Sequence, residues 1–89
     1  MNKEMKRMVA KIDECFKSLK KGDVVIWKIN PKFRSIVTII DNDEDGCNYK
    51  LNVEMYAKGK WDFFGSNYQK DMEEHITMLY ETLTKGLAK

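Results

Sequence analysis

The sequence predicts a small α+β domain of the order α-β-β-β-(β)-α, in which two helices pack on one face of a three- or four-stranded antiparallel sheet. Three observations predict this class. Apolar residues recur at helical spacing near both ends of the chain, they alternate with polar residues in the middle, and short polar segments separate the alternating stretches. With 89 residues and one proline, the chain is expected to form a single globular domain with one core, spanning 1–89.

The first predicted element is an amphipathic helix that begins near residue 3. Its apolar residues fall on one side of a helical wheel. They are Met5, Met8, Val9, Ile12, Phe16 and Leu19. Gly22 can adopt the positive φ that often follows a helix, so we expect the helix to end near Lys21.

The middle of the chain is predicted to form strands. Residues 24–29 and 33–40 are rich in β-branched side chains, and the segment 30–32 contains the proline that separates them. The acidic segment 41–46 ends in Asp-Gly and is too polar for a strand interior, so a hairpin turn is expected there. Residues 49–57 alternate strictly, which predicts a strand with one buried face.

The last elements are a short strand and a second helix. The segment 58–60 is expected to turn the chain into a short fourth strand at 61–64. Ser66 and Gln69 form a capping-box pattern. The apolar face that follows, Tyr68, Met72, Ile76, Leu79 and Leu83, predicts a helix to about Lys85, with Gly86 as its C-terminal cap.

The predicted order of elements resembles that of the double-stranded RNA-binding domain. In that family a Lys-rich start to the second helix binds phosphates, whereas the matching stretch here, 65–71, has one Lys beside an acid. The resemblance therefore implies a topology and no binding residues. The sequence Lys20-Lys21-Gly22-Asp23-Val24-Val25 also resembles the opening of SH3-like barrels, which implies a curled sheet flanked by helices as an alternative.

Charge is distributed unevenly along the chain. Residues 1–34 carry ten Lys and Arg against four Asp and Glu, whereas residues 35–89 carry six against ten. Most of this asymmetry lies on the outer face of the first helix, which we call the basic ridge. It consists of Lys3, Lys6, Arg7, Lys11, Lys17 and Lys21. Such a ridge can follow a phosphate backbone or can simply be a solvated helix face.

A second candidate surface is the face of the sheet that points away from the helices. If Val25, Trp27, Ile29, Val37, Ile39, Leu51, Val53 and Met55 point toward the helices, alternation directs several aliphatic and basic side chains outward. The resulting interface candidates are Ile26, Lys28, Arg34, Ile36, Ile40, Lys50 and Tyr56, with Val24 beside them. An apolar and basic face of this kind suits a protein interface, unless a barrel or sandwich buries it.

Residue types that carry catalysis or bind metals are few and scattered. The acidic segment resembles the first half of an EF-hand loop, but Asn52 stands where the bidentate Glu is expected, so a solvated turn is favoured over a Ca²⁺ site. His75 is interpreted as a hydrogen-bonded histidine at the edge of a core, and Cys15 as a small buried side chain. With Cys47 far from both in sequence, we expect no catalytic residues, no metal site and no cofactor.

The sequence therefore favours a non-enzymatic binding protein that acts as an inhibitor, adaptor or regulator through a protein interface. A homodimer and an RNA or DNA complex made by the basic ridge are the alternatives. No apolar stretch approaches the length of a membrane span, so a soluble protein is expected. Two distant cysteines that suggest no disulfide framework favour a cytoplasmic location. The preference for Lys over Arg is typical of AT-rich coding sequence, as in some bacteria and their phages, and suggests a phage-type accessory protein.

Overall fold

The chain forms one four-stranded antiparallel sheet flanked by two helices. The computed structural model describes residues 2–68 and 72–88. The elements are α1 (Lys3–Phe16), β1 (Val24–Lys28), β2 (Phe33–Asp43), β3 (Gly46–Ala57), β4 (Lys60–Tyr68) and α2 (Met72–Leu87). The strand order is β1-β2-β3-β4, so every strand pairs with its neighbours in sequence. The predicted α+β class and the fourth strand are confirmed.

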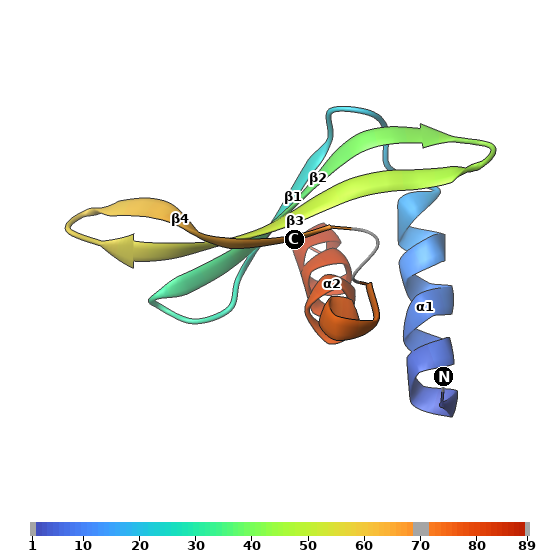
Figure 1. Cartoon of the computed structure of the whole chain (residues 1–89), viewed down its shortest axis with the longest axis horizontal. Coiled ribbons are helices and arrows are strands. Elements are labelled where there is room, and N and C mark those ends of the chain that lie inside the picture. Colours follow the sequence, from blue (N-terminus) through green and yellow to red (C-terminus); the bar gives the residue numbers. More distant parts are fainter. Residues whose placement is uncertain (1, 69–71, 89) are drawn as a thin grey trace.

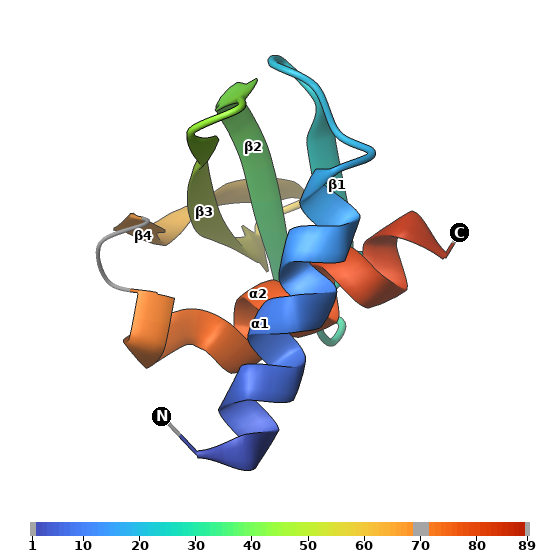
Figure 2. The ribbon, with the colours of Figure 1, turned by 90° about the vertical axis from the view of Figure 1, so that its right-hand side faces the viewer.

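Both helices lie on the same side of the sheet, with the C-terminal end of α1 close to the far end of β2 and β3 (Figure 1). Helix α2 packs against β1 and β2, and α1 packs mainly on α2, as the view along the sheet shows (Figure 2). The core lies between the two helices and the sheet. It consists of Met8, Ile12, Phe16, Leu19, Val25, Val37, Ile39, Tyr49, Leu51, Ile76, Leu79 and Leu83.

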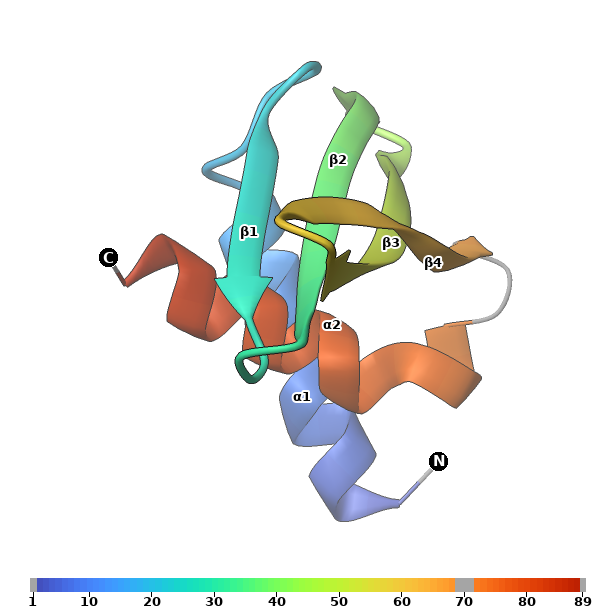
Figure 3. The same ribbon diagram turned by 90° about the vertical axis from the view of Figure 1, so that its left-hand side faces the viewer.

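The sheet is strongly twisted, and the β3–β4 hairpin projects away from the helices (Figure 1). In Figure 3, β4 runs across the direction of β1 and β2. The register between strands shifts between Ile39 and Asp41 and again between Val53 and Glu54, and such irregularities increase local twist. The tip of the β3–β4 hairpin is a two-residue turn in which Lys58 and Gly59 both have positive φ, a geometry that suits a twisted hairpin.

Helix α1 ends earlier than the sequence predicts. It stops at Phe16, and a tight turn carries Leu19 into the core. Asn42, at the far end of β2, donates hydrogen bonds from its amide nitrogen to the carbonyl oxygens of Phe16 and Leu19, at 2.7 and 2.6 Å. The prediction of a helix to Lys21 was therefore wrong because a distant side chain caps carbonyls that a longer helix would bond internally.

More of the acidic segment 41–46 belongs to strands than the sequence predicts. Asp41 and Asp43 belong to β2, and only Glu44 and Asp45 lie in the turn before Gly46 begins β3. The hairpin turn is confirmed, but its position was set too early because the backbone ladder of β2 and β3 continues through the polar residues. Gly46 has φ of 138°, a conformation that favours glycine.

The junction of β4 and α2 also differs from the prediction. Ser66, expected to cap the second helix, lies in β4 opposite Asn52, and Tyr68 is the last residue of that strand. Gln69 lies outside the described residues. Helix α2 begins at Met72, is kinked at His75, and continues through Leu87, so Gly86 lies inside the helix and not beyond its end.

The predicted alternation correctly assigns most strand residues to the inward or the outward face of the sheet. Val25, Val37, Ile39 and Leu51 are buried as predicted, and the side chains expected to point outward are exposed or half-buried. Ile29 departs from the pattern with 38% of its surface exposed, because it lies just past the end of β1 in the turn to β2. No helix in the described residues is long and apolar enough to span a lipid bilayer.

Candidate protein-interaction surface

The structure brings the predicted interface residues together on the outward face of the sheet, the face turned away from α2. Strand pairing places Ile26 beside Ile36, and Lys28 beside Arg34. Val24, Ile26, Ile40 and Tyr56 expose 53, 43, 47 and 46% of their surface, whereas Ile36 is half-buried between its neighbours. Exposed large apolar side chains that are contiguous on one sheet face are typical of an interaction surface.

An ordered cluster of four side chains lies at one end of this face. Arg34 donates from Nε to Oε1 of Glu54 at 2.7 Å, and its Nη2 lies 2.6 Å from the same oxygen. The Arg34 guanidinium also stacks 4.7 Å from the centre of the Trp61 ring. Tyr56 meets Trp61 edge to face, with ring centres 5.2 Å apart. We call Arg34, Glu54, Tyr56 and Trp61 the aromatic-arginine cluster.

Contacts within the sheet hold the cluster in place. The side chains of Arg34 and Glu54 are only 28 and 24% exposed, and each is held by contacts from a neighbouring strand. Arginine, tryptophan and tyrosine are the residues most enriched in the energetic centres of protein interfaces, and side chains already held in place lose less conformational entropy on binding. The cluster and the adjacent aliphatic side chains therefore form a preorganised surface suited to another protein.

Sequence reasoning found Arg34 and Tyr56 but missed Glu54 and Trp61. Their roles depend on which residues face each other across strands. The structure has a two-residue turn at 58–59, which pairs Tyr56 with Trp61, whereas the predicted three-residue turn at 58–60 would place Ala57 opposite Trp61. Phe63, which is 66% exposed and pairs with Glu54, extends the same face and was missed for the same reason.

The basic ridge is partly neutralised by neighbouring groups, and its members Lys17 and Lys21 lie beyond the end of α1 and not on the predicted longer helix. Arg7 donates to Glu4 at 2.6 Å and stacks on Tyr80 with 5.6 Å between its guanidinium carbon and the ring centre. This partnership raises the pKa of Arg7 and lowers the pKa of Glu4, mainly through the shared hydrogen bond. Two further members of the ridge also contact acids, in the pairs Lys11–Glu14 at 3.6 Å and Lys21–Asp41 at 3.7 Å.

These contacts make the ridge less suited to a phosphate backbone than the sequence suggests. A phosphate would compete with a carboxylate at three of its six members. Lys3 and Lys6 are exposed on α1, and Lys17 is exposed at the C-terminal cap of that helix. The nucleic-acid hypothesis stays a prediction, with less favourable electrostatics than the basic residue count alone indicates.

The carboxylates of the β2–β3 turn do not converge on a common point. Asp41 points toward Lys21, and Asp43 accepts a hydrogen bond from the backbone nitrogen of Asp45 at 2.9 Å. Across residues 2–68 and 72–88, no group of three His, Cys, Asp or Glu side chains is arranged to hold a metal ion. The β2–β3 hairpin places Asn42 beside the end of α1, where its amide nitrogen donates to the Phe16 carbonyl oxygen.

The single histidine belongs to a buried pair. His75 and Tyr49 expose only 5 and 2% of their surfaces, and Nε2 of His75 lies 3.0 Å from the Tyr49 hydroxyl. The interpretation of His75 as a hydrogen-bonded histidine is confirmed. Burial raises the pKa of the Cys15 and Cys47 thiols, which keeps them protonated at neutral pH and lowers their nucleophilicity.

Tyr49 is expected to make the fold sensitive to high pH. Burial raises its pKa to about 12, whereas an unfolded tyrosine titrates near pH ~10. The stability that Tyr49 contributes is thus fully present below pH ~10 and is lost as pH rises toward its folded pKa. Denaturant unfolding of Tyr49→Phe should show a smaller loss of stability between pH 8 and 11 than the wild type shows.

The same variant is expected to be less stable at pH 8, by about 1–2 kcal/mol, because the buried His75 loses its hydroxyl partner. Tyr56→Phe, which removes a half-exposed phenol on the outward face, controls for general effects of alkaline pH. An identical pH dependence in Tyr49→Phe and the wild type would contradict the assignment of this effect to Tyr49.

Comparisons with known proteins leave the chain without an assigned relative. No family model, curated protein or solved structure matches it. The resemblances in element order noted above therefore assign no family.

Proposed function

We propose that this chain is a non-enzymatic binding protein whose outward sheet face engages another protein. The observation that carries the proposal is the aromatic-arginine cluster, which is ordered and partly desolvated and lies next to Ile36 and exposed Ile26 on the same face. A centre of Arg, Trp and Tyr beside an aliphatic surface has the composition of a protein-interface hot spot. An inhibitor, adaptor or regulator is the class of protein that such a surface serves.

The charge of the outward face favours a partner surface that is both apolar and acidic. Lys28, Arg34 and Lys50 lie on this face, and Glu54 is the acid that Arg34 contacts. Complementary charge at the rim of an interface mainly increases the association rate and the specificity, while buried aromatic side chains supply most of the affinity. Raising the salt concentration should therefore slow association more than it speeds dissociation.

Trp61→Ala is expected to weaken binding to the partner by about 2 kcal/mol, roughly thirtyfold in Kd, because it removes the ring that holds both Arg34 and Tyr56. The measurement is quantitative affinity capture from lysate of the source organism, with and without nuclease. Wild type, Trp61→Ala and Ile36→Asp are compared, and circular dichroism verifies that each variant is folded.

Lys17→Gln on the basic ridge is the matched control. Proteins that are lost with both outward-face variants but retained with Lys17→Gln, in the presence of nuclease, support the proposal. Identical recoveries for all four versions would contradict it. If recovery depends on nuclease-sensitive material and on Lys17, the basic ridge and a nucleic acid replace the sheet face as the functional surface.

A further inference from the structure

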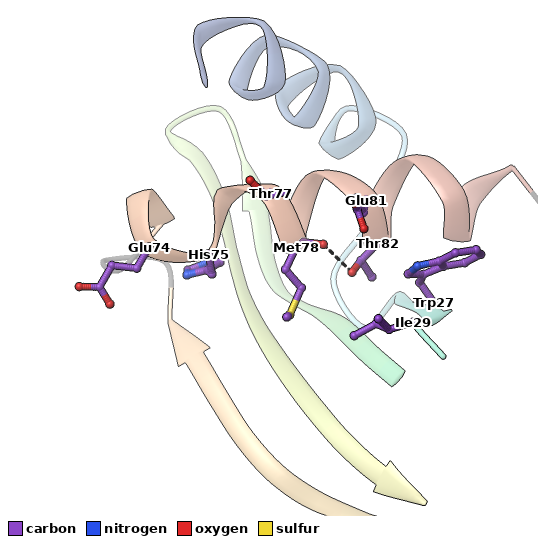
Figure 4. Close-up of a pocket in the computed structure, with 8 residues that line it drawn as sticks. All are labelled: Trp27, Ile29, Glu74, His75, Thr77, Met78, Glu81 and Thr82. Carbon is purple, nitrogen blue, oxygen red and sulfur yellow. Dashed lines mark hydrogen bonds between the residues drawn. The ribbon is translucent and has the colours of Figure 1, made fainter. Parts of the chain in front are cut away.

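A concave surface lies on the side of the sheet opposite the outward face, between α2 and the strands that curl away from this helix. It consists of two adjoining hollows of about 370 and 440 Å³ that share Ile29 and Met78. Figure 4 shows Met78 extending from α2 toward the sheet, with Ile29 and Trp27 on the far wall of the first hollow. Phe33, Val53 and Phe64 line the second. We call this surface the helix–sheet groove.

The strand wall of the groove is held by local hydrogen bonds and ring contacts. The Asn30 side-chain oxygen accepts from the backbone nitrogens of Lys32 and Phe33, at 2.8 and 2.9 Å, which fixes the turn that carries Ile29. Phe33 packs edge to face on Phe64, with ring centres 5.2 Å apart. Phe64 stands at the irregularity where β3 and β4 change register. The groove is therefore preformed.

The helix wall is equally constrained. The side-chain hydroxyl of Thr82, which lines the groove, donates to the Met78 carbonyl oxygen at 2.7 Å and makes a buried hydrogen bond with Ser35 from β2. His75, at the kink of the helix, is held by Tyr49. These contacts join α2 to β2 and β3, so the distance between the two walls is set by the core.

The groove differs from the outward face in charge. Its helix wall includes two carboxylates, Glu74 and Glu81, and none of its described lining residues is Lys or Arg. Lys85 lies at one end, where it contacts Glu81 at 4.0 Å and stands over Trp27. The interior is apolar, and the structure leaves Phe64 61% exposed beside it. An apolar groove with an acidic rim complements a ligand that is apolar and basic.

We propose that the helix–sheet groove binds a peptide segment of a partner protein in which large apolar side chains lie next to Lys or Arg. The two hollows would receive apolar side chains against Ile29 and Met78, while the basic groups approach Glu74 and Glu81. The outward face carries Lys28 and Lys50 beside the Arg34–Glu54 pair, whereas the groove rim carries Glu74 beside the Glu81–Lys85 pair, so the two surfaces favour partners of opposite charge. The chain then has the layout of a two-sided adaptor.

The test is a methyl NMR titration of the whole chain labelled at Ile and Met methyl groups. The probes are two synthetic peptides of equal length, one alternating Leu and Phe with Lys and the other with Glu in place of every Lys. The Lys peptide is expected to shift the Ile29 and Met78 methyl signals. The Glu peptide should bind more weakly by about fivefold or more, because it places like charges beside Glu74 and Glu81.

Two groove variants and one control sharpen the result. Ile29→Ser at an exposed turn position should weaken the Lys peptide about tenfold, because it removes apolar surface from both hollows. Glu74→Gln combined with Glu81→Gln should reduce the preference for the Lys peptide over the Glu peptide. Lys28→Gln, on the outward face, should change neither value.

Three results would overturn the proposal. The first is equal affinity for the two peptides, and the second is a pattern of shifts confined to Ile26 and Ile36 on the outward face. The third is movement of the Ile29 and Met78 signals on dilution of the protein alone, which would assign the groove to a second copy of this chain. The proposal for the outward face is tested separately by Trp61→Ala, and its outcome does not depend on the peptide titration.

Discussion

Truncation of Leu79 to alanine is expected to lower the free energy of unfolding by about 2–5 kcal/mol. Leu79 is fully buried in the middle of α2, the element that packs against α1 on one side and against β1 and β2 on the other. The loss combines the transfer free energy of the deleted carbons with the cost of a cavity between the layers. For a domain of this size, with a total stability of roughly 5–13 kcal/mol, that is a large fraction.

The same substitution at Leu87 provides the control. Leu87 is the last residue of the same helix and is 41% exposed, so Leu87→Ala should change stability by less than about 1 kcal/mol. Equilibrium unfolding in guanidinium chloride, followed by tryptophan fluorescence and circular dichroism, measures both variants. Equal losses at the two positions would mean that α2 is not the central layer of the core.

The sequence predicts elements best where the pattern and the packing agree. The alternation in residues 49–57 predicts β3 because Tyr49 and Leu51 are buried in the structure, while Lys50 between them is half-buried and Tyr56 beyond them is exposed. The apolar stripe of residues 3–16 predicts α1 for the same reason, since Met8 and Ile12 are the residues that the helix buries. Local pattern is sufficient for these elements.

Element ends were predicted poorly because distant residues determine them. Ser66 has the sequence context of a helix cap, yet pairing with Asn52 keeps it in β4. Leu19 continues the helical apolar pattern, but Asn42 caps the helix before it. Pairing and capping partners that lie more than ten residues away leave no local pattern, so tertiary contacts override the local preference.

Local pattern also predicted only part of the candidate surfaces. Alternation alone placed Ile26, Ile40 and Tyr56 on the outward face. The aromatic-arginine cluster required the register that joins Arg34 to Glu54 and Tyr56 to Trp61. The helix–sheet groove could not be predicted, because it depends on the twist of the sheet and on how far α2 lies from the β1–β2 turn.

Replacement of Gly86 by alanine is expected to destabilise the fold, although alanine is the better helix former. A Cβ atom at this position would lie 2.5 Å from Cγ1 of Val25 and 3.1 Å from the carbonyl oxygen of Ile26. Both contacts are with β1, so α2 can approach this strand closely only because residue 86 lacks a side chain. The glycine therefore sets the spacing between the helix and the sheet.

Two opposing effects determine the size of the change. Alanine gains about 1 kcal/mol of helix propensity over glycine in a helix interior. Overpacking against a buried side chain and a strand backbone costs about 1–3 kcal/mol, and Val25 has little room to move because it is 5% exposed. Because a carbonyl oxygen fixed in the sheet is one of the clashing atoms, we expect the clash to dominate, with a net loss of up to about 2 kcal/mol.

Gly65→Ala is the matched control, because a Cβ atom there would have no neighbour within 4 Å and the backbone φ is not positive. It should change the free energy of unfolding by less than about 0.5 kcal/mol. Val25→Ala combined with Gly86→Ala should destabilise by less than the sum of the single variants, because the smaller side chain relieves the clash. An additive double variant, or a stabilised Gly86→Ala, would show that the helix end moves away from β1 at little cost.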